Sequence, residues 1–412
     1  MRTHAAYDCD VMVIGGGTLG LATARALERA APGVRVTVLE RAAAGAVDRP
    51  GPDDGVIACG VRHRPGSFEA RTAVRGAAEL ADFCAEHGIR HTMAGELIVA
   101  TDRGELPRLH ALAQRGRQHR LPVRELGPAQ IAEYEPWVRG LAGIRVGGAG
   151  TADAGAVRAA LAADAVAAGA VVRYGCEVVA VDRRPWGVAV RTADGAVVRA
   201  RTLVNCAGPH ADRVARLTGD RPGIRLVRFR EPRFSVGRPE LVRGQVHTVP
   251  PAGLPGPLGF PAGLRLTRGT DGALHVGAGA PLVPASGTAA PAEHPGAWRT
   301  AVRHLRHRTA GTLRPWSDEA FTAALRRLLP DLGEDDLRPS GVAVHTRAML
   351  PDGGLTDGFL VREAPHTVHV LNAPTPVAAV ALPLGREVAR RALASARGTG
   401  WRPPAVESGH CV

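Results

Sequence analysis

A glycine-rich segment near the amino end carries the most distinctive chemistry of this sequence. Residues 10–20 read DVMVIGGGTLG, so Gly15, Gly17 and Gly20 form the pattern G-x-G-x-x-G between an apolar run and an amphipathic run. In this pattern the first glycine makes a tight turn, the second lets the backbone approach a pyrophosphate, and the third lets a helix pack closely on a strand. Glu40 ends the later run VTVLE, where a carboxylate accepts hydrogen bonds from a ribose and repels a 2′-phosphate. The segment therefore predicts a dinucleotide site at a helix amino terminus.

Two later segments favour a flavin over a nicotinamide. TLVNCAG at 202–208 matches the second nucleotide-contacting segment of flavoproteins, in which small residues let the chain pass close to the cofactor. NAPTPVAAVALPLG at 372–385 is a proline-broken loop that leads into a helix, and it is placed like the segment that covers the flavin ring. A helix amino terminus there stabilises negative charge on the reduced ring. We therefore predict FAD, bound by Gly15, Gly17, Thr18, Leu19, Gly20, Glu40, Arg41, Val178, Ala207, Gly208, Pro374, Thr375, Pro376 and Val377.

The hydrophobic pattern predicts the elements that must position these residues. Residues 8–40 alternate as strand, glycine turn, helix and strand, which is one βαβ unit. Helices are expected over 68–87, 103–119, 153–169, 296–309, 317–329 and 383–396. Strands are expected over 177–184, 187–193 and 196–208, with a tight turn at Asp194-Gly195, and then over parts of 221–282, 340–346 and 366–372.

These elements predict an α/β protein with two domains. A Rossmann-like FAD-binding domain is expected over 1–82, 145–218 and 338–398. A second α+β substrate domain, built on a mixed or antiparallel sheet, is expected over 83–144 and 219–337, with a flexible tail at 399–412. A chain of 412 residues is too long for one ordinary core, which agrees with this division.

The composition excludes several function classes. All 52 basic residues are arginine, so neither a lysine Schiff base nor a Walker phosphate loop is available. The net charge of +13 comes without a basic run interleaved with aromatic residues, which argues against nucleic-acid binding. The cysteines show no metal-binding spacing and are expected as small core residues of a cytoplasmic protein. Their positions are Cys9, Cys59, Cys84, Cys176, Cys206 and Cys411. The first strand is expected to begin at about residue 8, so we expect no signal peptide before it. The sequence has no run of eighteen uncharged apolar residues, so we expect no membrane-spanning helix.

Over most of its length the chain resembles the FAD-dependent oxidoreductases of the D-amino-acid oxidase and glycine oxidase superfamily, and is most similar to the L-2-hydroxyglutarate oxidases. The matching segments include VIGGGTLGLATA, GVIACGVRHRPGSFEA, GIRHTMAGELIVAT, ELGPAQIAEYEPWVRGLAGI, LVNCAG, LTRGTDG, PDGGLTDGF and NAPTPVAA. The resemblance implies oxidation of a 2-hydroxy acid to a 2-oxo acid, with electrons passed on to oxygen or a quinone.

The sequence departs from this family at its expected site residues. Ala58 stands where the resemblance implies a histidine, and Ala343 where it implies a carboxylate-binding arginine. Oxidation of an alcohol needs a base, for which histidine is suited, and a cation for the carboxylate, for which arginine is suited. We therefore predict His63 or His345 as the base and Arg62, Arg265 or Arg347 as anion clamps. His345 and Arg347 share a face with Ala343 if the strand persists.

Because Ala58 and Ala343 depart from the family pattern, other functions also remain open. An alcohol or amine on a larger scaffold of specialised metabolism is one alternative substrate, and an amino acid oxidised at its C–N bond is another. A flavin-binding protein with a non-oxidative or lost catalytic role is a third reading, and an NAD enzyme is a fourth. A small-molecule substrate is expected in each enzymatic case, without a metal. No sequence feature favours peripheral membrane contact.

Overall fold

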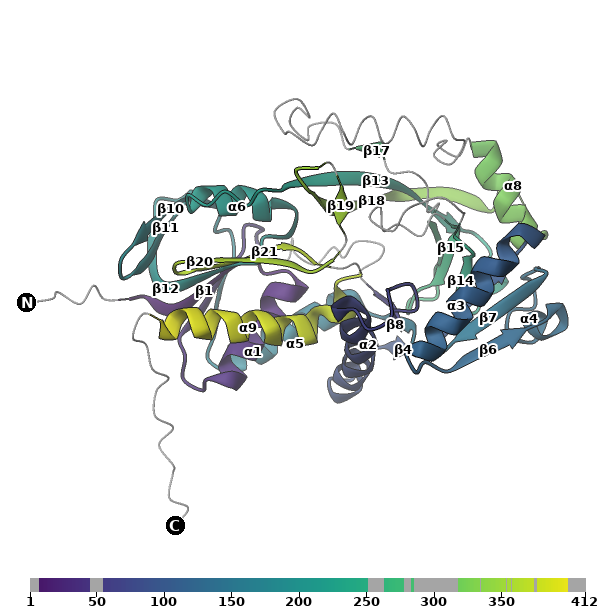
Figure 1. Cartoon of the computed structure of the whole chain (residues 1–412), viewed down its shortest axis with the longest axis horizontal. Helices are drawn as coiled ribbons and strands as arrows, with labels where there is room; N and C mark the ends of the chain where they lie inside the picture. Colours follow the sequence, from purple (N-terminus) through teal and green to yellow (C-terminus); the bar gives the residue numbers. More distant parts are fainter. Residues whose placement is uncertain are drawn as a thin grey trace, which may run out of the picture. The chain divides into compact units, whose positions relative to one another are not determined.

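The computed structural model describes residues 7–44, 55–250, 263–277, 283–284, 318–333, 335–352, 354–356, 358–373 and 376–398. The chain divides into two compact units (Figure 1). Unit 1 comprises 1–50, 155–226 and 358–412, and unit 2 comprises 51–154 and 227–357. Residues 51–82, 145–154 and 338–357, which were expected in the FAD-binding domain, therefore fall in unit 2. Residues 219–226 fall in unit 1. The assignment of cofactor and substrate to the two units stays a prediction.

Unit 1 is built on a sheet whose centre is parallel. The central strands run in the order β21-β12-β1-β2-β9, all parallel to their neighbours. The amino-terminal half of β12 pairs with the antiparallel hairpin of β10 and β11, and β20 pairs with β21. The strands are β1 (Cys9–Ile14), β2 (Val36–Leu39), β9 (Val171–Arg173), β10 (Val178–Arg184), β11 (Gly187–Thr192), β12 (Val197–Asn205), β20 (Leu360–Ala364) and β21 (Thr367–Asn372). This order, with β1 central and crossover helices between parallel strands, is Rossmann-like, as predicted.

The helices of unit 1 are α1 (Thr18–Ala30), α5 (Ala154–Ala167), α6 (Ala211–Leu217) and α9 (Ala381–Arg397), with short 3-10 turns η3 (Gly208–His210) and η7 (Ala378–Val380). Helices α1 and α9 lie side by side (Figure 1). A Cβ on Gly385 would lie 2.8 Å from the Ala22 carbonyl, so glycine at this position permits the close approach of the two helices. Apolar residues such as Leu27 and Leu384 are fully buried on these helices.

Unit 2 is built on a mixed, mainly antiparallel sheet, as predicted. Its described strands run in the order β19-β18-β13-β16-β15-β14-β5-β7-β6, with β17 paired to β13 and only the β14–β5 pair parallel among the registers assigned. The strands are β5 (Glu96–Ala100), β6 (Val123–Leu126), β7 (Ala142–Val146), β13 (Arg225–Val236), β14 (Gln245–Thr248), β15 (Arg265–Arg268), β16 (Leu274–Gly277), β17 (Val283–Pro284), β18 (Leu337–Met349) and β19 (Leu355–Thr356). Because β18 belongs to this sheet, residues 338–349 lie in unit 2.

A smaller sheet and several helices complete unit 2. Strands β3 (Val56–Ile57), β8 (Gly150–Ala152) and β4 (His91–Thr92) form a three-stranded sheet. The β3–β8 pairing explains why the residues after 54 belong to unit 2 and not to unit 1. The helices are α2 (Phe68–Glu86), η2 (Arg103–Glu105), α3 (Leu106–Gln118), α4 (Pro128–Tyr134), η4 (Pro239–Leu241) and α8 (Asp318–Leu328).

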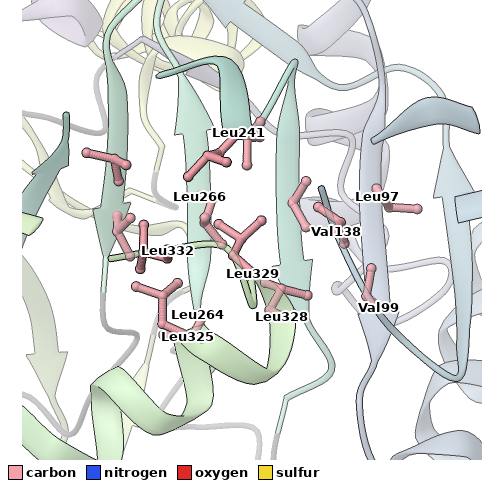
Figure 2. Packing of buried hydrophobic residues seen from close by; sticks show 14 of the residues in the cluster. Leu97, Val99, Val138, Leu241, Leu264, Leu266, Leu325, Leu328, Leu329 and Leu332 are labelled. Atoms are coloured by element: carbon pink, nitrogen blue, oxygen red, sulfur yellow. The ribbon is translucent and has the colours of Figure 1, made fainter. Parts of the chain in front are cut away.

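The two faces of the large sheet differ in chemistry. One face carries leucine and valine side chains from β5, β14, β15 and β16, which pack against leucines of α8 and of the turn after it (Figure 2). Leu266, Leu325, Leu328 and Leu329 of this cluster are fully buried. Burial of this many aliphatic side chains, each worth ~1.5–3 kcal/mol, anchors α8 to the sheet. Side chains alternate along a strand, so the other face carries the polar residues of β13 to β16 and, on β5 and β7, a second apolar cluster with α3 that includes Ile98 and Ile144.

Most predicted elements are confirmed. The βαβ unit, the hairpin at Asp194-Gly195 and the helices at 68–87, 103–119, 153–169, 317–329 and 383–396 all match described elements within a few residues. The expected helix at 296–309 and the tail at 399–412 lie outside the described residues. Among the helices that the structure describes, none has the length and apolar content needed to cross a lipid bilayer.

Candidate functional site

The glycine pattern forms a tight backbone cradle at the start of α1. Gly15 has a φ of +105°, and a Cβ there would collide with the Cys206 carbonyl of the neighbouring strand end. A Cβ on Gly20 would collide with the Gly15 carbonyl oxygen, so this glycine lets α1 start directly against β1. A Cβ on Gly17 would meet no atom within 4 Å. The open space at Gly17 fits the close approach of a pyrophosphate to the helix amino terminus at Thr18 and Leu19.

Glu40 closes this cradle from the end of β2. Its Oε2 accepts a hydrogen bond of 2.7 Å from the Gly16 backbone N–H, and its Oε1 accepts one of 2.7 Å from Ala42. These bonds fix the carboxylate at the edge of the glycine turn. A carboxylate offers about four acceptor positions, so acceptors remain for ribose hydroxyls.

A small pocket lies beside the cradle, entirely within unit 1. Five predicted cofactor-binding residues line it together, namely Gly15, Glu40, Arg41, Val178 and Ala207. Sequence reasoning missed other lining residues, including Cys176, Glu177, His210 and Arg213. Arg213 donates a hydrogen bond of 3.3 Å to Glu177, which places an ion pair at the pocket rim.

A buried asparagine, Asn205, fixes the turn that follows β12. Asn205 donates a hydrogen bond of 2.7 Å to the Ala211 carbonyl and accepts one of 3.2 Å from the Ala207 N–H. The chain then turns at Gly208, whose φ is +53°. His369 of β21 lies 3.1 Å from the Asn205 amide nitrogen, and burial lowers its pKa although Asp220 acts in the opposite direction. These hydrogen bonds fix the turn that carries Ala207, a residue that lines the pocket.

The third predicted segment is described only in part. Pro374 and Thr375 lie outside the described residues, whereas Pro376 and Val377 precede η7 and α9. Val377 has a helical φ of −67° and begins the turn that leads into α9. Contact of these four residues with a cofactor stays a prediction.

The polar face of the unit 2 sheet gathers the predicted catalytic residues, from strands far apart in sequence. Arg233, Gly277, Arg265 and His247 lie opposite one another on β13, β16, β15 and β14. On β18, Ala343, His345 and Arg347 are buried while Val342 and Val344 are exposed, as the predicted alternation requires. We call this surface the polar sheet face.

Glu231 lies at the centre of one cluster on the polar sheet face. His345 Nε2 lies 2.6 Å from Glu231 Oε2, and Arg233 and Arg265 have guanidinium nitrogens 3.3 Å and 3.8 Å from the same oxygen. A Cβ on Gly277 would come within 2.7 Å of Glu231 Oε1, so glycine makes room for the carboxylate. A buried histidine paired with a carboxylate is the arrangement of an oriented general base.

Glu96 of β5 lies at the centre of a second cluster. Arg62 donates a hydrogen bond of 3.0 Å to Glu96, Cys59 donates one of 2.9 Å, and His247 Nε2 lies 3.2 Å from it. Burial alone would raise the pKa of the Glu96 carboxyl, but the charges of Arg62 and His247 and the two hydrogen bonds hold it below its usual value. Glu96 therefore stays ionised and fixes one edge of the Arg62 guanidinium.

Arg62 keeps donors available for a ligand. Its side chain is 26% exposed, and its buried Nε and Nη2 atoms have no hydrogen-bond partner among the described residues. Arg265 is 15% exposed, whereas Arg233 is 3% exposed. Arg62 and Arg265 are thus the guanidinium groups of the two clusters that a small molecule can reach.

The structure brings together four of the five predicted catalytic residues on or beside one face: Arg62, Arg265, His345 and Arg347. His63 follows the turn at Gly60, and its carbonyl accepts a hydrogen bond from His119. Its role as a base stays a prediction. Sequence reasoning missed Glu96, Glu231, Arg233 and His247. The available signal was a charged or imidazole side chain inside a strand with apolar neighbours, as in ELIVA and QVHT.

Comparison with known sequences supports an FAD enzyme. The family model described as "FAD dependent oxidoreductase" matches residues 10–391. The L-2-hydroxyglutarate dehydrogenase of Salmonella houtenae is 32% identical over 92% of both chains, and that of Escherichia coli K12 is 31% identical over 92% of both. The mitochondrial L-2-hydroxyglutarate dehydrogenase of Homo sapiens is 28% identical, over 94% of this chain and 89% of its own.

Solved structures share the fold at low sequence identity. L-alpha-glycerophosphate oxidase from Mycoplasma pneumoniae, with FAD bound, superposes with a TM-score of 0.71 at 19% identity, covering 96% of this chain and 95% of its own. Glycine oxidase from Geobacillus kaustophilus has a TM-score of 0.68 at 18% identity and covers 94% and 95%.

Proposed function

Since the chain belongs to the family of FAD-dependent oxidoreductases, we propose that it oxidises a 2-hydroxy dicarboxylic acid to the 2-oxo acid. The observation that carries this proposal is a partly exposed arginine in each of the two clusters. Arg62 Nη1 lies 3.0 Å from Glu96 Oε2, and Arg265 Nη2 lies 3.8 Å from Glu231 Oε2.

The reachable cations Arg62 and Arg265 belong to different clusters, one beside Glu96 and the other beside Glu231. Planar guanidinium groups bind carboxylates through paired hydrogen bonds. A dicarboxylate with one end on each arginine therefore suits this surface better than a monocarboxylate does. The substrate named for the curated relatives, L-2-hydroxyglutarate, has this charge.

FAD, when bound in the cradle of unit 1, supplies the two-electron acceptor for the hydride of the carbinol carbon. On the protein side, His345 takes the hydroxyl proton, and Glu231 at 2.6 Å orients the imidazole and stabilises its protonated form. His247, paired with Glu96 at 3.2 Å, is the alternative base on the same face. The arginines hold the carboxylates and so orient the hydroxyl toward one of these bases.

The test is anaerobic mixing of the FAD-loaded protein with L-malate, L-2-hydroxyglutarate, L-lactate, L-aspartate and L-glutamate. We expect 2-hydroxy dicarboxylates to bleach the yellow flavin band faster than L-lactate. Bleaching by the amino acids alone would replace the proposal with an amine oxidase, and bleaching by dithionite alone would indicate a non-oxidative flavoprotein.

Arg62→Gln sharpens this test. Loss of one charge-assisted contact of ~1.5–3 kcal/mol should lower kcat/KM for a dicarboxylate about 10- to 100-fold and leave L-lactate unaffected. Arg75→Gln, which removes an exposed arginine paired with Glu79 on α2, is the matched control. An equal loss for both substrates would contradict the binding of the second carboxylate by Arg62.

A further inference from the structure

A groove rich in arginine runs between α1 and α9 in unit 1, and it takes no part in the function proposed above. Arg25 and Arg29 of α1 and Arg386, Arg390 and Arg397 of α9 line it, over a floor of alanine and leucine. The groove has a volume of about 600 Å³, and no aspartate or glutamate is among its lining residues. We call it the arginine groove.

The spacing of these arginines places like charges next to one another along each helix. Arg25 and Arg29 are four residues apart on α1, and Arg386 and Arg390 are four apart on α9. Like charges at this spacing lie on one helix face and destabilise the helix. The two helices also pack closely at Gly385, which brings the two positively charged rows to one groove.

Carboxylates compensate this charge only in part. Arg25 pairs with Asp164 at 2.5 Å, and Arg390 pairs with Glu387 at 2.8 Å. In the part of the chain that the structure describes, neither Arg29 nor Arg397 has a carboxylate within ion-pair distance, and both are exposed. Some arginines on other surfaces of the two units are paired, such as Arg184 with Asp182 and Arg117 with Glu125. The groove is distinguished by five arginines around one opening that no aspartate or glutamate lines.

We propose that the arginine groove binds a polyanion with closely spaced phosphate groups. A phosphate group offers a compact cluster of acceptor oxygens to which planar guanidinium groups bind in pairs, and neighbouring phosphates neutralise several arginines at once. Isolated carboxylates do so less well because each carries one charge. Arginine stems can pack along an apolar floor while their heads stay in water, and Arg29 and Arg397 are exposed at this groove. Soluble polyphosphate compounds and anionic phospholipid headgroups share this chemistry.

Binding is measured on the full-length, FAD-loaded protein with tripolyphosphate at constant ionic strength, by calorimetry and by the shift in Tm. A ligand that binds only the folded state raises Tm. We expect Arg29→Gln/Arg397→Gln to weaken tripolyphosphate binding at least tenfold and to abolish the rise in Tm. The control Arg184→Gln/Arg191→Gln removes the same charge from the β10–β11 hairpin of unit 1 and should bind as the parent does.

The source of the phosphate is separated by co-sedimentation with vesicles of phosphatidylglycerol or of phosphatidylcholine. Binding to phosphatidylglycerol that Arg29→Gln/Arg397→Gln abolishes would identify a lipid surface as the ligand. Groove-dependent binding of tripolyphosphate alone would identify a soluble ligand. Equal weakening by both double variants, or no binding of either probe by the parent protein, would overturn the proposal. None of these readouts depends on catalysis, so their result is independent of the proposed oxidation.

Discussion

The dinucleotide pocket of unit 1 and the polar sheet face of unit 2 are built from different parts of the polypeptide. The pocket is shaped mainly by backbone: a glycine at positive φ, a helix start and the ends of β1, β2 and β12. The polar sheet face is shaped by charged side chains from several strands and the loop that bears Arg62. The first region therefore has no room for a Cβ atom at Gly15 or Gly20, and the second is sensitive to an uncompensated change of charge.

This difference has a functional meaning within the proposed oxidation. Backbone N–H groups at a helix start bind any pyrophosphate, which is a constant feature of the cofactor. Charged side chains on strands can be exchanged one by one without rebuilding the sheet. The site departures at Ala58 and Ala343 fall in unit 2, where substitution leaves the backbone intact.

The largest effect is expected for Glu231→Gln. Removal of this carboxylate leaves the buried cations Arg233 and Arg265 without their shared partner, which should cost about 3–5 kcal/mol of the free energy of unfolding. Turnover should fall at least ~100-fold because His345 loses its orienting partner. Unfolding in denaturant and stopped-flow reduction measure the two effects.

The FAD content of folded Glu231→Gln should remain that of the parent protein, because Glu231 lies outside the dinucleotide pocket. Glu231→Asp serves as the milder variant if Glu231→Gln does not fold. If both variants have the stability and turnover of the parent protein, Glu231 neither compensates the buried arginines nor orients His345.

The opposite pattern is expected in the glycine cradle. Gly20→Ala places a Cβ against the Gly15 carbonyl and should cost about 1–3 kcal/mol together with most of the bound FAD. Gly17→Ala meets no atom of the chain within 4 Å, so it should keep the Tm of the apoprotein and lose FAD affinity only. The ratio of flavin to protein and the Tm of the apoprotein separate the two. If Gly17→Ala binds FAD as tightly as the parent protein does, the pyrophosphate does not lie at this glycine.

The smallest expected effect is a difference in how two buried carboxyl groups, Glu28 and Glu96, change the stability of the protein with pH. Glu28 of α1 is buried, its Oε1 has no hydrogen-bond partner among the described residues, and burial raises its pKa from 4.5 to about 7. Its folded pKa exceeds the unfolded value, so Glu28 lowers stability as the pH rises from 4.5 to 7. Glu28→Gln should therefore be ~1–3 kcal/mol more stable than the parent at pH 8, with no difference below pH 4.5.

Glu96 has the opposite sign. Because its folded pKa is lowered, it stabilises the protein above its unfolded pKa, and this contribution is lost as the pH falls toward the folded value. Glu96→Gln should thus be less stable than the parent protein near neutral pH, and its stability should fall less steeply as the pH is lowered. Thermal unfolding from pH 4 to pH 8 checks both variants, and the same slope for both would contradict the assigned pKa directions.

Sequence reasoning succeeded where the signal is contiguous. The glycine pattern, the helix after it and Glu40 lie within one short segment, so residue order alone predicts that they meet. Ala207 also lines the predicted pocket because the parallel strands β1, β2 and β12 end at the same edge of the sheet, whereas Val178 lines it from the start of β10 in the antiparallel hairpin. The domain boundaries were harder, since β3 and β18 were assigned by order along the chain while pairing with β8 and β13 decides their unit.

The charged clusters show the limit of the sequence. Arg62, Arg265, His345 and Arg347 were selected by residue type, but nothing in the sequence connects Glu231 to His345, which lies 114 residues away. Glu96 in ELIVA resembles the polar residue of a half-buried strand until the pairing places it beside Arg62 and His247.

The sequence by itself determined the dinucleotide cradle, because its geometry depends on neighbouring residues and on the absence of Cβ atoms. Only the tertiary structure decided which arginines share a carboxylate and which remain reachable by a ligand. Those relations depend on strand register, and register is fixed by the burial of the opposite, aliphatic face against α8.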